Sequence, residues 1–161
     1  MRESLRDVIF PVVLHQLAQL NIAHMRAAID DPLMADFVAQ LARVNAVADA
    51  APGFVWRLQN LDGNTVGIGG FDDPKILVNL SVWTSLESLR AYAYESAHVE
   101  VLRQRQRWFA RATEAYQVLW WVSAGERPTV AEARLRLGRL RLEGPTPAAF
   151  TFAHSFPAPT T

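Results

Sequence analysis

The segment Ile76–Trp83 constrains the fold most strongly, because its two faces differ in character. Successive side chains of a strand point to opposite sides of a sheet. One face of this segment is therefore purely aliphatic, and the other carries Asn79, Ser81 and Trp83. An aliphatic face needs a helix packed on it, whereas an amide, a hydroxyl and an indole together suit the wall of a cavity. We expect a sheet whose two faces serve different purposes.

The hydrophobic periods predict a single domain over residues 1–161, with the order β-α-β-β-α-β in a core of about residues 14–123. Asp31 and Pro32 are typical of the start of the first helix, and Thr129 of the last. The order indicates an α+β, ferredoxin-like fold, with a C-terminal helix and an extended or frayed tail at about 129–161. The expected strands cover residues 15–23, 54–59, 76–83 and 114–123.

Two helices on one face of such a sheet leave the other face open. We expect the open face to be the mixed one, which carries Asn21, Asn79, Ser81 and Trp83. Two copies that close these faces together would form a homodimeric α/β barrel, with each mixed face as a wall of the pocket.

Composition excludes several classes of function. The formal net charge is +0 and there are no cysteines, which argues against nucleic-acid partners, thiolate metal sites and cysteine nucleophiles. The four histidines, at positions 15, 24, 98 and 154, have no metal-ligand spacing, so we expect no metal. No apolar run approaches the ~20 residues that span a bilayer, and the N-terminus does not resemble a signal peptide. A cytoplasmic protein without a membrane partner is expected.

The predicted catalytic residues are His98, Asn21 and Arg57. If the helix restarts with Ser96 as its N-cap, His98 lies near a helix N-terminus, where a neutral imidazole can act as a general base. In a continuous helix, His98 could be a base, a haem ligand or a hydrogen-bonded core residue. An Asn amide can stabilise a developing oxyanion. Arg57 could hold an anion, or it could form a salt bridge to a neighbour such as Glu114. The predicted substrate-binding residues are Asn79, Ser81, Trp83, Tyr94, Trp56 and His24.

Several segments resemble a bacterial family described only as a domain of unknown function, within the dimeric α/β-barrel, antibiotic-biosynthesis-monooxygenase-like superfamily. They are QLAQLNIAHMRA, PGFVWRLQ, VNLSVWTSLESLRAYAYESAHVEVL and AYQVLWWV, and the resemblance extends over about residues 14–152. The superfamily includes cofactor-free quinone-forming monooxygenases, haem-degrading oxygenases, small-molecule isomerases and non-catalytic members.

The haem degraders of that superfamily use an Asn on the first strand and a histidine on a helix, places that Asn21 and His98 match here. Their Trp lies in the helix, whereas Trp83 of this chain lies in a strand. The expected cofactor is therefore none, with haem as the alternative.

The resemblance implies a cofactor-independent monooxygenase-like enzyme that acts on an aromatic or polyketide-type small molecule. In this hypothesis His98 removes a phenolic or α-proton, Asn21, Asn79 and Trp83 position the substrate, and Arg57 steadies the anion. A non-oxidative isomerase or cyclase needs the same groups. A non-catalytic barrel that binds a ligand or haem is the remaining alternative.

Overall fold

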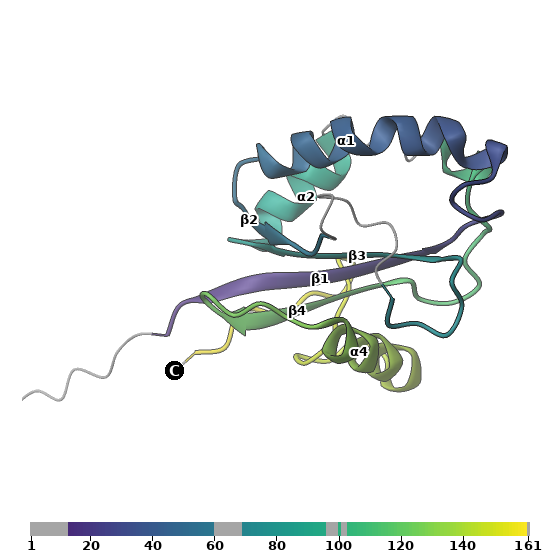
Figure 1. The fold of residues 1–161 in the computed structure, drawn as a ribbon. Helices are drawn as coiled ribbons and strands as arrows, with labels where there is room; N and C mark the ends of the chain where they lie inside the picture. The colour runs from purple at the N-terminus through teal and green to yellow at the C-terminus, as the bar shows by residue number, and fades with distance from the viewer. Residues whose placement is uncertain (1–12, 60–68, 96–99, 101–102, 161) are drawn as a thin grey trace, which may run out of the picture.

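The computed structural model describes residues 13–59, 69–95, 100 and 103–160. It contains one antiparallel four-stranded sheet in the order β2-β3-β1-β4 (Figure 1). The strands are β1 (His15–His24), β2 (Phe54–Arg57), β3 (Ile76–Trp83) and β4 (Gln117–Ser123). Within the described residues, the longer helices are α1 (Ala35–Asp49), α2 (Leu86–Glu95) and α4 (Val130–Glu143), and short 3₁₀ turns lie at η1 (Pro32–Met34) and η2 (Arg105–Arg107). This is the predicted α+β, ferredoxin-like order.

The two predicted helix starts are confirmed by their capping bonds. The carboxylate of Asp31 accepts a hydrogen bond from the Leu33 amide at 2.8 Å, and the turn η1 leads directly into α1. The hydroxyl of Thr129 accepts from the Glu132 amide at 3.1 Å at the start of α4. Each cap satisfies an amide that has no partner inside its own helix.

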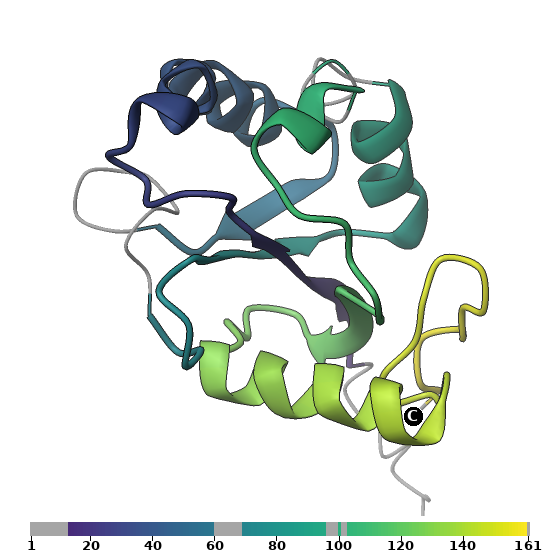
Figure 2. The same cartoon turned by 90° about the vertical axis from the view of Figure 1, so that its right-hand side faces the viewer.

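The sheet lies between two helical layers. Figures 1 and 2 show α1 and α2 over one face and α4 beneath the other. Alternate residues of β1, β3 and β4 point toward α4 from the aliphatic side of the sheet. The buried side chains of α4 that pack against them are Ala133, Leu137 and Leu140. A helix therefore covers the aliphatic face, as the sequence predicted.

The prediction that the mixed face of the sheet is left open by the helices is wrong. Helices α1 and α2 lie over the mixed face. This is seen from one pocket, which is lined by residues of both helices and of that face. The connections β1-α1-β2 and β3-α2-β4 each join parallel strands of one sheet, and such crossovers are right-handed, which places both helices on the same side. The mixed face therefore cannot close against a second copy, and the argument for a barrel through that face fails.

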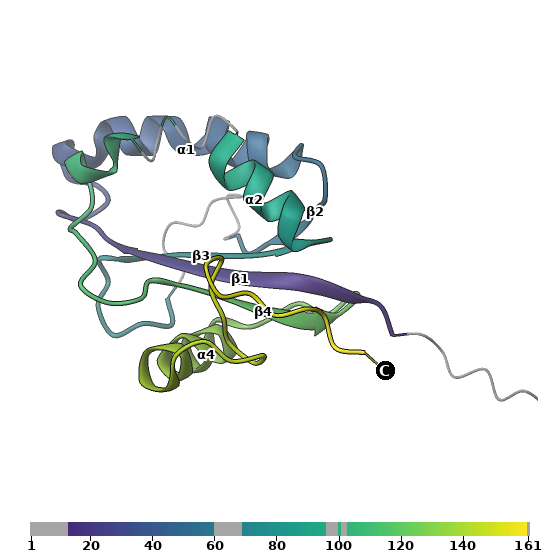
Figure 3. The same ribbon diagram turned by 180° about the vertical axis from the view of Figure 1, so that it is seen from behind.

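The tail was predicted to be extended or frayed, and the structure excludes the frayed alternative. The ring of Phe150 is fully buried, and its backbone exchanges two hydrogen bonds of 2.8 Å with Leu119 at the outer edge of β4. The indole Nε1 of Trp121 donates to the carbonyl of Phe156 at 2.8 Å. Figure 3 shows this C-terminal segment running beside β4. The tail therefore covers the β4 edge of the sheet and buries apolar side chains against it.

Candidate functional site

A pocket of about 140 Å³ lies between the mixed face of the sheet and helices α1 and α2. Its volume is close to the ~150 Å³ of an engineered apolar cavity that holds one benzene ring. It is smaller than the ~300–1,000 Å³ of sites for drug-sized ligands. The pocket therefore suits a compact molecule with about one ring. Both its floor and its helical wall come from a single chain.

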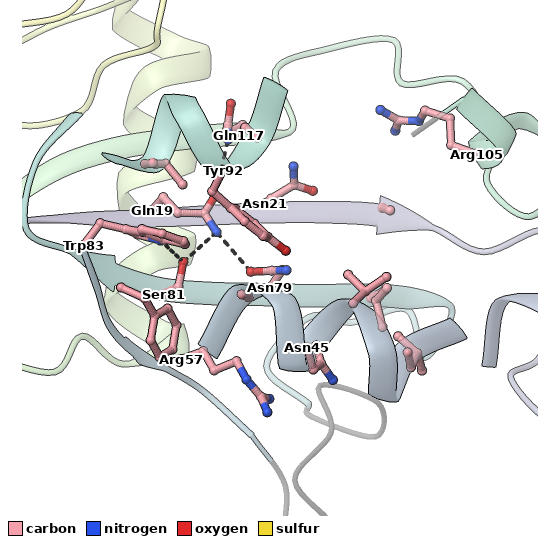
Figure 4. Close-up of a pocket in the computed structure, with 18 of the residues that line it drawn as sticks. Gln19, Asn21, Asn45, Arg57, Asn79, Ser81, Trp83, Tyr92, Arg105 and Gln117 are labelled. Atoms are coloured by element: carbon pink, nitrogen blue, oxygen red, sulfur yellow. Dashed lines mark hydrogen bonds between the residues drawn. The ribbon is translucent and has the colours of Figure 1, made fainter. Parts of the chain in front are cut away.

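Polar side chains of β1 and β3 form a connected network on the floor of the pocket (Figure 4). The Gln19 amide nitrogen donates to Asn79 Oδ1 and to Ser81 Oγ, both at 3.0 Å. The Trp83 indole nitrogen donates to the same Ser81 oxygen at 2.9 Å. Gln117 extends the network from β4 by donating to Gln19 Oε1 at 3.4 Å.

The network determines which atoms remain for a ligand. An indole nitrogen only donates, and a hydroxyl has two acceptor positions and one donor. Ser81 Oγ accepts from both Gln19 and Trp83, so its own O–H is left as a donor. Asn79 accepts through its oxygen, so its NH₂ group is also left as a donor. The floor of the pocket therefore presents donors, which match an acceptor such as a carbonyl or phenolate oxygen.

Three amide side chains stand side by side across the sheet. Asn21 of β1 is directly opposite Asn79 of β3 and opposite Gln117 of β4. The expectation that Asn21 and Asn79 are neighbours is thus confirmed by the strand register. Within the described residues the Asn21 side chain has no hydrogen-bond partner, although it lines the pocket. A further amide nitrogen on the α1 wall, Asn45 Nδ2, is buried without a partner in the described part of the chain.

Aromatic rings line the end of the pocket nearest Trp83. Tyr92 of α2 stacks on Trp83 with centroids 5.0 Å apart and planes at 26°. Phe54 meets the same indole edge-on at 5.4 Å. Burial raises the pKa of Tyr92 to about 12, and the nearby charge of Asp49 adds to this effect while Arg57 opposes it. At neutral pH Tyr92 is therefore a neutral phenol rather than a base.

Arg57 lines the pocket and forms an ion pair with Asp49 at the end of α1. Its Nε lies 2.7 Å from one carboxylate oxygen, and its Nη2 lies 3.2 Å from the other. The salt bridge anticipated for Arg57 exists with this partner instead of Glu114, which pairs with Arg141 at 3.2 Å. The carboxylate holds the guanidinium in place and offsets its charge.

The structure brings five predicted site residues together and places three elsewhere. The pocket is lined by Asn21, Arg57, Asn79, Ser81 and Trp83. Tyr94 is 61% exposed and meets Phe152 instead, since it lies two positions from Tyr92 and faces away from the sheet. Trp56 packs against the aliphatic core, and His24 is exposed at the end of β1. His98 lies outside the described residues, so its predicted role as a base stays a prediction.

Sequence reasoning missed Gln19, Gln117, Tyr92, Asn45 and Arg105 as lining residues. The period of two along β1 and β4 could have found Gln19 and Gln117, because each shares a face with residues already singled out. Arg105 could not have been found in this way, since its position depends on the irregular turn η2.

No group of three or more His, Asp or Glu residues that could hold a metal occurs in the described part of the chain. None of the described helices is long and apolar enough to cross a membrane.

A family model described as "Domain of unknown function (DUF3291)" matches residues 16–161, which confirms the family resemblance predicted from sequence. No curated protein matches the chain in sequence. Among solved structures, the chain is similar to SnoaB, a cofactor-independent oxygenase from Streptomyces nogalater, at 18% identity and a TM-score of 0.41. That alignment covers 71% of this chain and 95% of SnoaB.

The chain is also similar to NE2512, a protein of unknown function from Nitrosomonas europaea, at 12% identity and a TM-score of 0.45. The alignment covers 72% of this chain and 97% of that protein. TM-scores below 0.5 mark a distant similarity, and neither protein's properties transfer to this chain.

Proposed function

We propose, for a chain that belongs to the DUF3291 family, a monooxygenase-like enzyme that uses no cofactor and acts on a small aromatic molecule. The substrate is a phenol or enol of about one ring, because the pocket has room for about that much. It lies on the mixed face of the sheet, under α1 and α2.

The main support for this proposal is the hydrogen-bond network on the floor of the pocket, which leaves donors available to a ligand. The Ser81 O–H and the Asn79 NH₂ group are left as donors for an acceptor atom of a ligand. The Asn21 amide beside them has no partner within the described residues. Preorganised donors of this kind stabilise an oxygen that gains negative charge during a reaction. They would hold the substrate oxygen as it becomes a phenolate, while Trp83 and Tyr92 contact its ring.

In the proposed reaction His98 removes the phenolic proton, which makes the ring electron-rich. The ring then reduces O₂: a C–O bond forms at a ring carbon that carried hydrogen, the O–O bond breaks, and the second oxygen leaves as water. A phenol and O₂ thus give a quinone and H₂O, and the substrate itself supplies all four electrons. Arg57 stabilises the phenolate, with Asp49 fixing its orientation.

A non-catalytic binding protein is the second candidate. One observation favours it: no Asp, Glu or His is found among the described residues that line the pocket. A non-oxidative isomerase or cyclase would need the same base as the oxygenase, so the two enzyme hypotheses differ in their need for oxygen.

Incubation with an electron-rich monocyclic polyphenol that has an open para position tests the proposal. We expect uptake of one O₂ per quinone formed and one labelled oxygen atom in the product under ¹⁸O₂. His98→Ala should abolish turnover and leave ring binding intact, while His154→Ala, at an exposed position in the tail, should change neither. Turnover that continues without oxygen would support the isomerase or cyclase instead, and binding without any product would support the non-catalytic protein.

A further inference from the structure

The pocket contains a second cation besides Arg57. Arg105 lines the pocket from the turn η2, beyond the Asn21 and Ala23 end of β1. Figure 4 shows its guanidinium turned away from η2 toward the side of the pocket that carries Asn21. Its carbon Cζ lies 5.2 Å from the centre of the Tyr116 ring, which supports the guanidinium from one side.

The two arginines differ in how their charge is balanced. Arg57 is paired with Asp49 at 2.7 Å. No described carboxylate lies within ion-pair distance of Arg105, and no Asp or Glu is among the described lining residues. The ligand space therefore combines an unbalanced positive charge at one end with hydrogen-bond donors at the other.

The neighbouring arginines do have carboxylate partners, so among these arginines the lack of a described one is specific to Arg105. Arg103 pairs with Glu100 at 3.8 Å, and Arg107 pairs with Asp36 at 2.9 Å. Both are more than half exposed, whereas Arg105 is partly buried against the pocket. A partly buried guanidinium without a carboxylate is the arrangement that an anionic ligand would complete.

From this arrangement we infer the substrate class: an aromatic carboxylate, with its carboxylate on Arg105 and its phenolic or carbonyl oxygen on Asn79 and Ser81. The inference rests on the proposed function, because it places the ligand in the same pocket. The geometry along β1 fits a molecule of this kind. Residues 19 to 23 span ~13 Å at ~3.3 Å per residue, and a para-substituted ring lies within that length. A planar carboxylate also matches the fork of a guanidinium, which can donate two parallel hydrogen bonds to it.

The test compares three single-ring probes by calorimetric titration of the full chain: 4-hydroxybenzoate, its neutral amide 4-hydroxybenzamide, and phenol. We expect 4-hydroxybenzoate to bind about 10-fold more tightly than the amide, from one charge-assisted pair at a partly exposed site. Arg105→Gln should remove that preference and leave the Kd of the amide unchanged. Arg105→Lys should retain part of it, and Arg103→Gln is the matched control that should behave as the wild type.

The outcomes separate the two proposals. Equal affinities for benzoate and amide, or an unchanged preference in Arg105→Gln, would overturn the role of Arg105 while ring binding still supports the pocket. Failure of all three probes to bind would overturn the inference and the proposed function together. A benzoate preference that weakens with added salt in the wild type, and is absent from Arg105→Gln, would support the inference.

Discussion

Replacement of Ser81 by alanine tests the hydrogen-bond network on the floor of the pocket. The Ser81 hydroxyl accepts from Trp83 Nε1 at 2.9 Å and from Gln19 Nε2 at 3.0 Å. Trp83 is 1% exposed and Ser81 is 4% exposed, so bulk water has little access to the position of the lost acceptor. A buried donor left without a partner costs ~1–3 kcal/mol. We expect Ser81→Ala to lower the free energy of unfolding by about 2 kcal/mol.

A double-mutant cycle with Trp83→Phe isolates this interaction. Phenylalanine removes the indole donor, so Ser81→Ala should cost less in the Trp83→Phe background than in the wild type. The volume lost at position 83 is common to both arms of the cycle and cancels. We expect a coupling free energy of ~1 kcal/mol or more, because the unsatisfied N–H is present only in the single Ser81→Ala variant.

Urea denaturation at neutral pH measures all four free energies, provided that the slope m is the same in each variant. Ser123→Ala is the matched control, because Ser123 lies in the same sheet and its side chain makes no hydrogen bond within the described residues. It should change stability by less than ~0.5 kcal/mol. If Ser81→Ala and Trp83→Phe were additive within ~0.5 kcal/mol, the reasoning about the network would be refuted.

Further predictions concern the tail, a turn and a phenol. Phe150→Ala should cost ~3–5 kcal/mol in urea denaturation, since its ring is fully buried, and a loss below ~0.5 kcal/mol would contradict the packed tail. Gly53→Ala should cost more than Gly125→Ala: both have positive φ, of 81° and 90°, but a Cβ at Gly53 would clash with the Ser88 side chain, whereas nothing lies within 4 Å of a Cβ at Gly125. Equal losses in thermal unfolding would contradict that steric argument. Stability should fall by about 2 kcal/mol from pH 10 to about pH 12, because the Tyr92 phenol ionises first in the unfolded chain, and Tyr92→Phe should lack this fall in parallel denaturation series. The same decline in both proteins would show that Tyr92 is not its source.

Features that depend on a few neighbouring residues could be predicted from the sequence. The two faces of Ile76–Trp83 follow from the period of a strand, and the caps at Asp31 and Thr129 follow from one side chain and an amide two or three positions away. The pairing of Asn21 with Asn79 follows from the order of the strands once the βαββαβ pattern is recognised. Each of these needs only local stereochemistry or a known topology.

The tertiary structure decided which helices cover which face. The helices α1, α2 and α4 all carry apolar side chains that fit a sheet, so hydrophobic patterning alone could not assign them. The right-handed crossovers placed α1 and α2 on the same side of the sheet. In the folded structure that side is the mixed face, and α4 packs on the aliphatic face. The pocket therefore lies inside one chain, where the sequence pattern suggested a space between two.

Charge pairing was also decided in three dimensions. The sequence contains sixteen basic and sixteen acidic residues, which says nothing about which arginine is neutralised. The end of α1 places Asp49 against Arg57, and the turn η2 brings Arg105 to the pocket without a described carboxylate. Strand period and capping are local and could be predicted from the sequence; the covered face and the unbalanced charge depend on contacts between residues far apart in the chain, and only the folded structure could determine them.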